Sequence, residues 1–456
     1  MNCCPSTVQK MNDQPTNKRK RDAVEIFQAG LQAVAPDAAI RRFCRLDDNI
    51  FTVADRRYNL DLFEKIIVLG AGKAGASMAG SIERIFGERI LAGLINVKYG
   101  HLAKLRRITV REGGHPVPDH QGLKGAEAIY KLAKTADEKT LVICLISGGG
   151  SALMPLPVKG ISLADKQKTT RVLLACGATI HEINTVRKHL STIKGGGLAR
   201  AIYPATLISL ILSDVVGDDL DSIASGPCVP DPTTFHDCKT IFVKYAIEDN
   251  IPGTVLDHIA AGIEGNVLET AKKEQAFFKK TQNVIIGRNF DALIHAKKKA
   301  DELGYNTLLL SSMLEGVTRD VAANHIAIAR EIQLHGYPLN RPACILSGGE
   351  TTVHIQGSGK GGRNQEFVLA AALKLSGLKN ITVLSGGTDG TDGPTDAAGA
   401  FCNETTVQRA LEAGLNPKKF LDNNDSYHFF EKLEDLYKTG PTHTNVMDLR
   451  IILLGA

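Results

Sequence analysis

Nine short apolar runs alternate with amphipathic segments along most of the chain. Each run is rich in Val, Ile and Leu and is apolar on both faces, as the strands of a parallel sheet covered by helices must be. Strand–helix alternation over the whole length predicts the α/β class, with two lobes built on mostly parallel sheets. The predicted strands are residues 65–70, 92–97, 141–147, 206–213, 283–287, 306–312, 343–348, 381–387 and 450–455.

The chain has 456 residues, which is long enough for two hydrophobic cores. A polar stretch over 231–280 separates the first four predicted strands from the last five. We therefore expect an N-terminal domain over 23–240 and a C-terminal α/β region over 241–456. Residues 1–22 are polar and carry the basic run Lys18–Arg21, so they are interpreted as a disordered tail, with a targeting signal as the alternative.

Three of the runs end in Ser-Gly-Gly. Ligands of parallel sheets bind beyond the carboxyl ends of the strands, where glycine brings bare N–H groups close to an anion. A single Ser-Gly-Gly can be an ordinary turn, but three at strand ends predict an assembled phosphate site. Its candidate residues are Ser147, Gly148, Gly149, Gly150 and Ser151 after one strand and Ser347, Gly348 and Gly349 after another.

The first strand runs into the sequence GAGKAG, which satisfies G-x-G-x-x-G. This dinucleotide pattern needs an acidic residue about 20 positions on, and Lys98 stands there instead. NAD binding is therefore disfavoured. Gly72 and Lys73 are predicted to face a phosphate, because a lysine among glycine amides is a compact positive charge suited to an anion.

Two further segments combine glycines with cations. Lys360 and Arg363 lie in GSGKGGRNQEF, where the planar fork of arginine suits a carboxylate or a phosphate. Arg187 and Lys194 precede another glycine trio and are candidate anion ligands, although a solvated basic helix face would look the same.

Aspartates follow two of the strands. Asp214, Asp389 and Asp392 are candidates for holding Mg²⁺, and Asp214 and Asp389 also for accepting a proton. The alternative is that such aspartates stabilise turns or cap a helix. His115, between Gly and Pro, is interpreted as structural.

Composition and charge argue against a nucleic-acid-binding protein and against a membrane-spanning one. The formal charge of +5 is small for this length and shows no clustering expected of a nucleic-acid binder. No apolar stretch is long enough to span a bilayer. Nine scattered cysteines include no Cys-x-x-Cys, so we expect a cytoplasmic protein in a reducing compartment, with a mitochondrial fraction left open.

Seven ordered motifs together resemble one family. GAGKA, GGHPVPD, SGGGSAL, VRKHLSTIKGGGLA, LSDVVGDDLDSIASGPCVPDPTT, GGRNQE and GTDGTDGPTDAAGA are similar to those of the class II glycerate 2-kinases, which end in a MOFRL domain. The resemblance implies phosphorylation of D-glycerate to 2-phosphoglycerate with ATP and Mg²⁺. It also implies a Rossmann-like N-terminal domain, a smaller MOFRL domain over about 340–450, and an active site in the cleft between them.

In this family the lysine of GAGKA and the arginine of GGRNQE are catalytic, which implies those roles for Lys73 and Arg363. Two alternatives stay open: an NAD(P)H-dependent hydroxypyruvate reductase and a non-catalytic nucleotide-binding module. A homodimer is left open as well.

Overall fold

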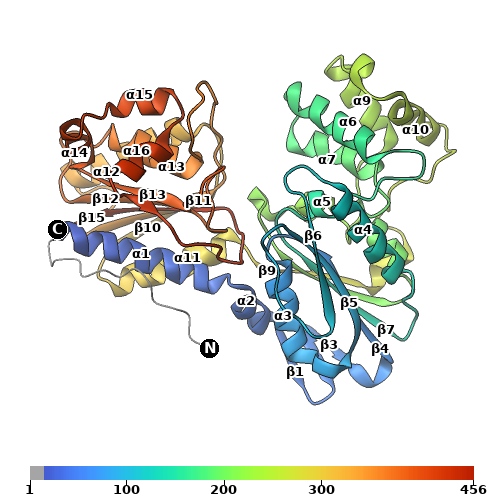
Figure 1. Ribbon diagram of the computed structural model, residues 1–456. Helices are drawn as coiled ribbons and strands as arrows, with labels where there is room; N and C mark the ends of the chain where they lie inside the picture. The colour runs from blue at the N-terminus through green and yellow to red at the C-terminus, as the bar shows by residue number, and fades with distance from the viewer. Residues whose placement is uncertain (1–14) are drawn as a thin grey trace. The chain divides into compact units, whose positions relative to one another are not determined.

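The computed structural model describes the fold of residues 15–456 and divides it into two compact units (Figure 1). The parallel-sheet unit comprises residues 35–288 together with 443–445. The mixed-sheet unit comprises residues 15–34, 289–442 and 446–456. Both units combine helices with one six-stranded sheet, so the predicted α/β class is confirmed.

The sheet of the parallel-sheet unit has the order β6-β5-β4-β7-β8-β9, and every neighbouring pair is parallel. The chain starts in the middle of this sheet, builds outward to one edge, and then returns to build the other side. The order reverses between β4 and β7, which makes their carboxyl ends the topological switch point. The strands are β4 (Lys65–Ala71), β5 (Ile90–Lys98), β6 (Ile108–Gly113), β7 (Thr140–Ile146), β8 (Thr206–Leu212) and β9 (Thr281–Gly287).

Helices cover both faces of this sheet. On one face α2 (Pro36–Phe43) and α3 (Gly75–Phe86) pack against the strands, together with the small antiparallel sheet β1 (Cys44–Asp47), β2 (Ile50–Val53) and β3 (Arg56–Asn59). On the other face lie α4 (His120–Ala133), α5 (Gly150–Leu153) and α8 (Gly197–Ile202). This two-sided burial explains why β7 is buried at all seven positions.

A separate helical cluster completes the unit. Its core joins apolar side chains of four helices with those of the connecting segments, Phe242 and Ile183 among them. The helices are α6 (Leu163–Ala175), α7 (Ile180–His189), α9 (Phe235–Lys244) and α10 (Gly253–Ile263).

The mixed-sheet unit has the order β10-β11-β15-β12-β13-β14, and only its β10–β11 pair is parallel. The last strand of the chain inserts antiparallel between β11 and β12. The prediction of mostly parallel sheets is therefore correct for the first unit only. The strands are β10 (Asn306–Leu314), β11 (Ala343–Gly349), β12 (Ile381–Gly387), β13 (Gly399–Asn403), β14 (Leu436–Tyr437) and β15 (Asp448–Leu454).

Helices flank this second sheet as well, and α12 and α13 share a core with its strands. The longer ones are α11 (Asn289–Glu302), α12 (Thr318–His335) and α13 (Arg363–Ala372), and the short ones are α14 (Thr406–Glu412), α15 (Pro417–Asp422) and α16 (Ser426–Lys432). None of the helices in the described part of the chain is long and apolar enough to cross a membrane.

The predicted domain boundary at 240/241 is wrong. Strand β9 pairs in parallel with β8, so the first sheet takes five of the nine predicted strands and the division along the chain falls at 288/289. The polar stretch that suggested a linker instead contributes α9 and α10 to the helical cluster. All nine predicted strands are present.

The prediction of a disordered tail over 1–22 is wrong for residues 15–22, which begin helix α1 (Pro15–Ala33); residues 1–14 lie outside the described residues. Figure 1 shows α1 beside α11, and its apolar face, Ala23, Ile26 and Phe27, is buried in the mixed-sheet unit. The basic run takes part in this packing, since Arg19 pairs with Glu404 at 3.5 Å and Lys20 with Asp435 at 3.0 Å.

Candidate active site

The loops after β4 and β7 interlock at the switch point of the parallel sheet. The backbone N–H of Lys73 donates to the carbonyl of Gly148 at 2.8 Å, and that of Ser147 donates to the carbonyl of Ala71 at 3.2 Å. The Ser147 hydroxyl accepts the N–H of Ala74 at 3.1 Å. Four residues that the sequence placed at a phosphate site, Gly72, Lys73, Ser147 and Gly148, are therefore neighbours.

Glycine at position 72 is required by this close approach. Its φ is +143°, and a Cβ there would lie 2.1 Å from the hydroxyl oxygen of Ser147, far inside van der Waals contact. Any side chain would push the two loops apart. The glycine pattern that suggests a dinucleotide site thus serves the packing of two neighbouring strand ends.

The loop after β7 leaves two amides open. Neither Gly148 nor Gly149 donates its backbone N–H to any residue that the structure describes. Gly149, with φ at +82°, directs the chain into α5. These donors are suited to phosphate oxygens.

Two polar side chains border the open amides. A Cβ on Gly148 would lie 2.2 Å from Oδ2 of Asp214, and one on Gly149 would lie 2.8 Å from Cδ2 of His115. Asp214 follows β8 and accepts a hydrogen bond of 3.2 Å from the side-chain amide of Asn445. His115, which the sequence suggested was structural, therefore lies beside the open amides. Asn445 belongs to none of the sequence motifs and comes from the segment 443–445 that folds with this unit.

Of the two predicted anion ligands of this unit, Lys194 contacts the loop after β7, and Arg187 lies close enough to Lys194 to act on its charge. Lys194 donates from Nζ to the carbonyl of Ser151 at 2.7 Å and to its hydroxyl at 2.9 Å. Burial and the charges of Lys166 and Arg187 lower the pKa of Lys194 well below its usual range. The alternative of a solvated basic helix face does not hold for Lys194, which is 2% exposed. Lys166 is a cation that the sequence analysis did not find.

In the mixed-sheet unit Arg363 opens helix α13 and is held by two carboxylates. Its Nε and one terminal nitrogen donate to Asp448 at 2.7 and 3.0 Å, and the other terminal nitrogen donates to Glu350 at 2.6 Å. Burial lowers the pKa of Arg363, but the Asp448 and Glu350 carboxylates raise it by more, so the net pKa lies above its ordinary value. A guanidinium has five N–H groups, and these three bonds leave two.

Asp392 and Asp389 make the contacts expected of aspartates that cap a helix or stabilise a turn, which was the alternative to metal binding. Asp392 is buried, and its carboxylate oxygens accept the backbone N–H groups of Asn364 at 3.0 Å and Gln365 at 2.8 Å, so it caps α13. Burial raises the pKa of Asp392 to about 6. Asp389 accepts the N–H and hydroxyl of Thr391, both at 3.0 Å, within a turn. No cluster of three or more His, Cys, Asp or Glu suited to a metal ion occurs within residues 15–456.

The remaining predicted phosphate ligands of this unit use their polar groups internally. Ser347 is fully buried, and its hydroxyl lies 2.8 Å from Nε2 of His325. Gly348 and Gly349 provide space for Asn289 and for the Leu314 backbone. In the glycine loop before α13, the N–H groups of Gly357 and Lys360 donate to Asn424 and Asp425. The ammonium of Lys360 lies 4.2 Å from the centre of the Tyr427 ring.

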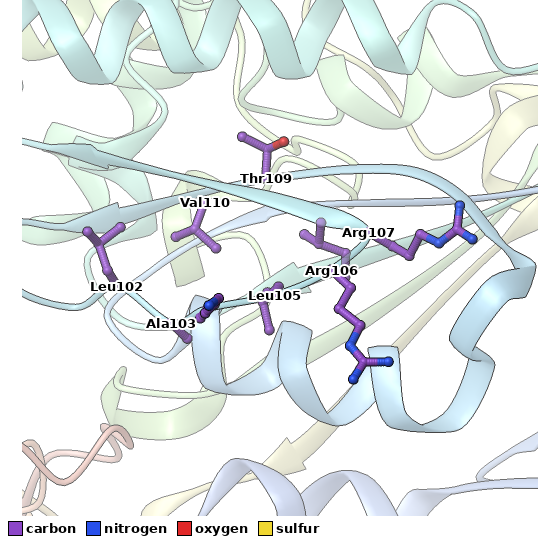
Figure 2. A pocket seen from close by; sticks show the side chains of 9 residues that line it. Leu102, Ala103, Leu105, Arg106, Arg107, Thr109 and Val110 are labelled. Atoms are coloured by element: carbon purple, nitrogen blue, oxygen red, sulfur yellow. The ribbon is translucent and has the colours of Figure 1, made fainter.

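A surface hollow of about 470 Å³ lies elsewhere, beside edge strand β6 (Figure 2). It is lined by the consecutive residues 102–110, and Figure 2 shows the side chains of Arg106 and Arg107 diverging from each other. None of the predicted site residues lines it. A depression formed by one chain segment offers no convergent polar groups, so we do not regard it as the active site.

Two family models match this chain. Residues 22–260 match a family model described as a domain of unknown function, DUF4147, and residues 343–448 match the MOFRL family. A glycerate 2-kinase from Pyrococcus horikoshii is 41% identical over 440 residues, which is 95% of this chain and 98% of the relative. This chain belongs to the glycerate 2-kinase family.

A member of this family from Thermotoga maritima has a crystal structure described as glycerate kinase. It is 38% identical, superimposes with a TM-score of 0.83, and the match covers 96% of this chain and all of that one. A relative from Agrobacterium vitis carries the provisional name hydroxypyruvate reductase. It is 42% identical over 393 residues, which is 86% of this chain and 87% of the relative.

Proposed function

We propose that this protein transfers the γ-phosphoryl group of ATP to the 2-hydroxyl of D-glycerate, forming 2-phosphoglycerate and ADP. Glycerate 2-kinases around 40% identical over most of the chain support this reaction. The observation in the structure that carries the proposal is the pair of open amides at Gly148 and Gly149, next to Lys73 at the switch point. Phosphoryl transfer depends on positioning and charge neutralisation, which such groups provide.

Within the parallel-sheet unit we assign the roles as follows. The amides of Gly148 and Gly149 and the ammonium of Lys73 hold phosphate oxygens, while Ser147 fixes the loop after β4. Asp214, at the end of β8 beside Gly148, accepts the proton of the attacking hydroxyl or holds a metal ion.

The residues present fit Mg²⁺, because this ion commonly binds proteins through one or two carboxylates together with substrate phosphates, and Asp214 supplies one beside the open amides. When bound there, Mg²⁺ would neutralise part of the phosphate charge. Asp389 and Asp392 are not needed for this assignment.

For Arg363 we propose the catalytic role that the family resemblance implies, since Asp448 and Glu350 leave two of its N–H groups open. An arginine that stabilises charge in a phosphoryl-transfer transition state is worth about 10³–10⁵ in rate. Arg363→Ala should therefore nearly abolish ADP formation with D-glycerate. Arg171→Ala, at an exposed position on α6, is the matched control and should retain full activity.

A double-mutant cycle tests whether Lys73 and Arg363 serve one transition state. We expect each single Ala variant to lose nearly all activity and the double variant to lose little more, because groups that act on the same atoms are not additive. Activity of Arg363→Ala above about a tenth of wild type would remove Arg363 from the mechanism. Fully additive losses would mean that the two residues act separately.

The same preparations test the two alternatives. A hydroxypyruvate reductase would oxidise NADH with hydroxypyruvate, and a nucleotide-binding module would bind ATP and glycerate without forming ADP. Lys98, the last residue of β5, occupies the place of the acid that binds the NAD ribose, which argues against the reductase.

A cytoplasmic location is part of the proposal. All seven cysteines in the described part of the chain are free thiols, and six of them are buried. This pattern is typical of a reducing compartment.

A further inference from the structure

Three cationic side chains gather inside the parallel-sheet unit. Lys166 comes from α6, Arg187 from α7, and Lys194 from the turn after α7. Lys166 is 5% exposed and Lys194 is 2% exposed. The three interact electrostatically: Arg187 acts on both lysines, and Lys166 acts on Lys194.

No acidic side chain among the described residues forms an ion pair with any of the three. Three acids that precede or follow them in the chain are used elsewhere. The Asp165 carboxylate accepts the N–H and the hydroxyl of Ser162 at 3.1 and 2.7 Å, Glu182 pairs with Lys244 at 2.6 Å, and Asp231 pairs with Lys188 at 2.7 Å. The described part of the chain therefore offers no acid to compensate positive charge on these three side chains.

The donors of this cluster are also incompletely used. Nζ of Lys166 is buried and has no hydrogen-bond partner in the part of the chain that the structure describes. Lys194 donates two hydrogen bonds to Ser151, and because an ammonium has three N–H groups, one of them is left for a ligand. Burying a charge without a partner costs free energy, and burial together with Arg187 lowers the pKa of Lys166 to about 7. An anion among these side chains would offset that cost.

We propose that Lys166, Arg187 and Lys194 form the binding site for the carboxylate of the acceptor acid. This inference rests on the proposed kinase function and names the substrate group that the cluster takes. Ser151 connects the cluster to the reaction, since it accepts two bonds from Lys194 and follows the open amides of Gly148 and Gly149 by two residues or three. A 2-hydroxy acid carries its carboxylate on the carbon next to the one whose hydroxyl is phosphorylated, so its two groups need binding sites that adjoin each other.

The carboxylate is favoured over a phosphate for a further reason. The phosphate oxygens already have donors at the switch point, in the Gly148 and Gly149 amides and Lys73. The cluster is drier and more enclosed, and it contains a guanidinium, whose planar fork suits a carboxylate.

The test is ligand binding to Lys166→Met, measured by titration calorimetry without turnover. Met removes the charge and keeps an apolar side chain of similar length. We expect D-glycerate alone to bind about ten- to a hundredfold more weakly, as for loss of a charged hydrogen bond, and ATP alone to bind within about twofold of wild type. Lys166→Arg should recover part of the affinity. Lys168→Met, exposed on the same helix, should change neither ligand.

A second titration uses glyceramide, the uncharged amide of the substrate. Wild type should lose affinity when the ligand carboxylate becomes an amide, whereas Lys166→Met should lose little more. Equal discrimination by both proteins would overturn the assignment, because the lysine and the carboxylate would then act independently.

The outcomes separate this inference from the proposed function. If wild type binds glycerate and Lys166→Met binds it equally well, the carboxylate site is wrong and the kinase proposal stands. If the variant loses ATP affinity instead, the cluster serves the nucleotide and the inference fails. If wild type binds no glycerate and forms no ADP, both fail. Thermal melting of the ligand-free variant checks folding, and it should melt no lower than wild type because an unpaired buried cation is removed.

Discussion

Arg363 and Asp448 form a two-point ion pair, with nitrogen–oxygen distances of 2.7 and 3.0 Å, although they are 85 residues apart in the chain. Asp448 is completely buried and also accepts bonds from Asn364 at 2.9 Å and from Arg450 at 3.2 Å. The Asp448 carboxylate therefore orients Arg363, the proposed catalytic arginine, and also compensates the charge of the buried Arg450.

Asp448→Asn should strongly destabilise the protein. Removing the charge leaves the buried Arg450 without its acid, and breaking a buried ion pair in this way costs about 3–5 kcal/mol. Glu350→Gln is the matched control. Glu350 pairs with Arg363, but its side chain is 43% exposed, so the free energy of unfolding should fall by less than about 1 kcal/mol. Urea unfolding measures both, and equal losses would contradict the central role of Asp448.

Gly148→Ala should impair catalysis by displacing side chains. The new Cβ would lie 2.1 Å from the Asn445 side-chain nitrogen and 2.2 Å from the Asp214 carboxylate, so both must move away from the loop. We expect kcat to fall at least about tenfold, since small misplacements of reacting groups cost about that or more. Gly253→Ala, where a Cβ meets nothing within 4 Å, should leave kcat unchanged. Wild-type turnover by Gly148→Ala would exclude Asp214 from the reaction.

The stability of the ligand-free protein should carry a pH-dependent penalty from Lys166. Its pKa is about 7 when folded against an ordinary value of 10.5, so the folded state binds its proton more weakly than the unfolded state does. The penalty is absent above about pH 10.5, grows as the pH falls toward 7, and is complete below 7.

Lys166→Met should therefore gain stability over wild type at pH 6 and lose that gain toward pH 10.5. The groups that act on Lys166 are Arg187 and Lys194, and Asp165 precedes it on the same helix. Denaturant unfolding across this range, with Lys168→Met alongside, gives the difference. A gain that does not vary with pH would show that Lys166 has the same pKa in the folded and the unfolded state, which would contradict the predicted penalty.

Helix α1 should be an integral part of the mixed-sheet unit. Phe27 is fully buried, and its ring lies edge-on to Tyr437 with 5.2 Å between the centroids. Phe27→Ala should cost about 3–5 kcal/mol, as expected when a buried aromatic ring leaves a cavity. Leu334→Ala, on the same unit but 63% exposed, should cost far less. A loss below about 1 kcal/mol for Phe27→Ala would mean that the helix is dispensable.

The sequence by itself determined the nine main strands, the α/β class and the family. Strands that are buried on both faces can be recognised as continuous apolar runs. The glycine loops after β4 and β7 can likewise be recognised from the local sequence alone. Lys73, Ser147 and Gly148 could be found in this way because the carboxyl ends of adjacent parallel strands meet.

Only the tertiary structure decided which strands pair and which charges meet. Strand β15 inserts between β11 and β12, and α1 packs on a unit that begins more than 250 residues later. Burial of apolar surface stabilises such contacts whatever the separation of the residues along the chain. The same holds for charge. A lysine such as Lys166 looks like any helix-surface residue in sequence, and its burial beside Arg187 and Lys194, without an acid, exists only once three elements have come together.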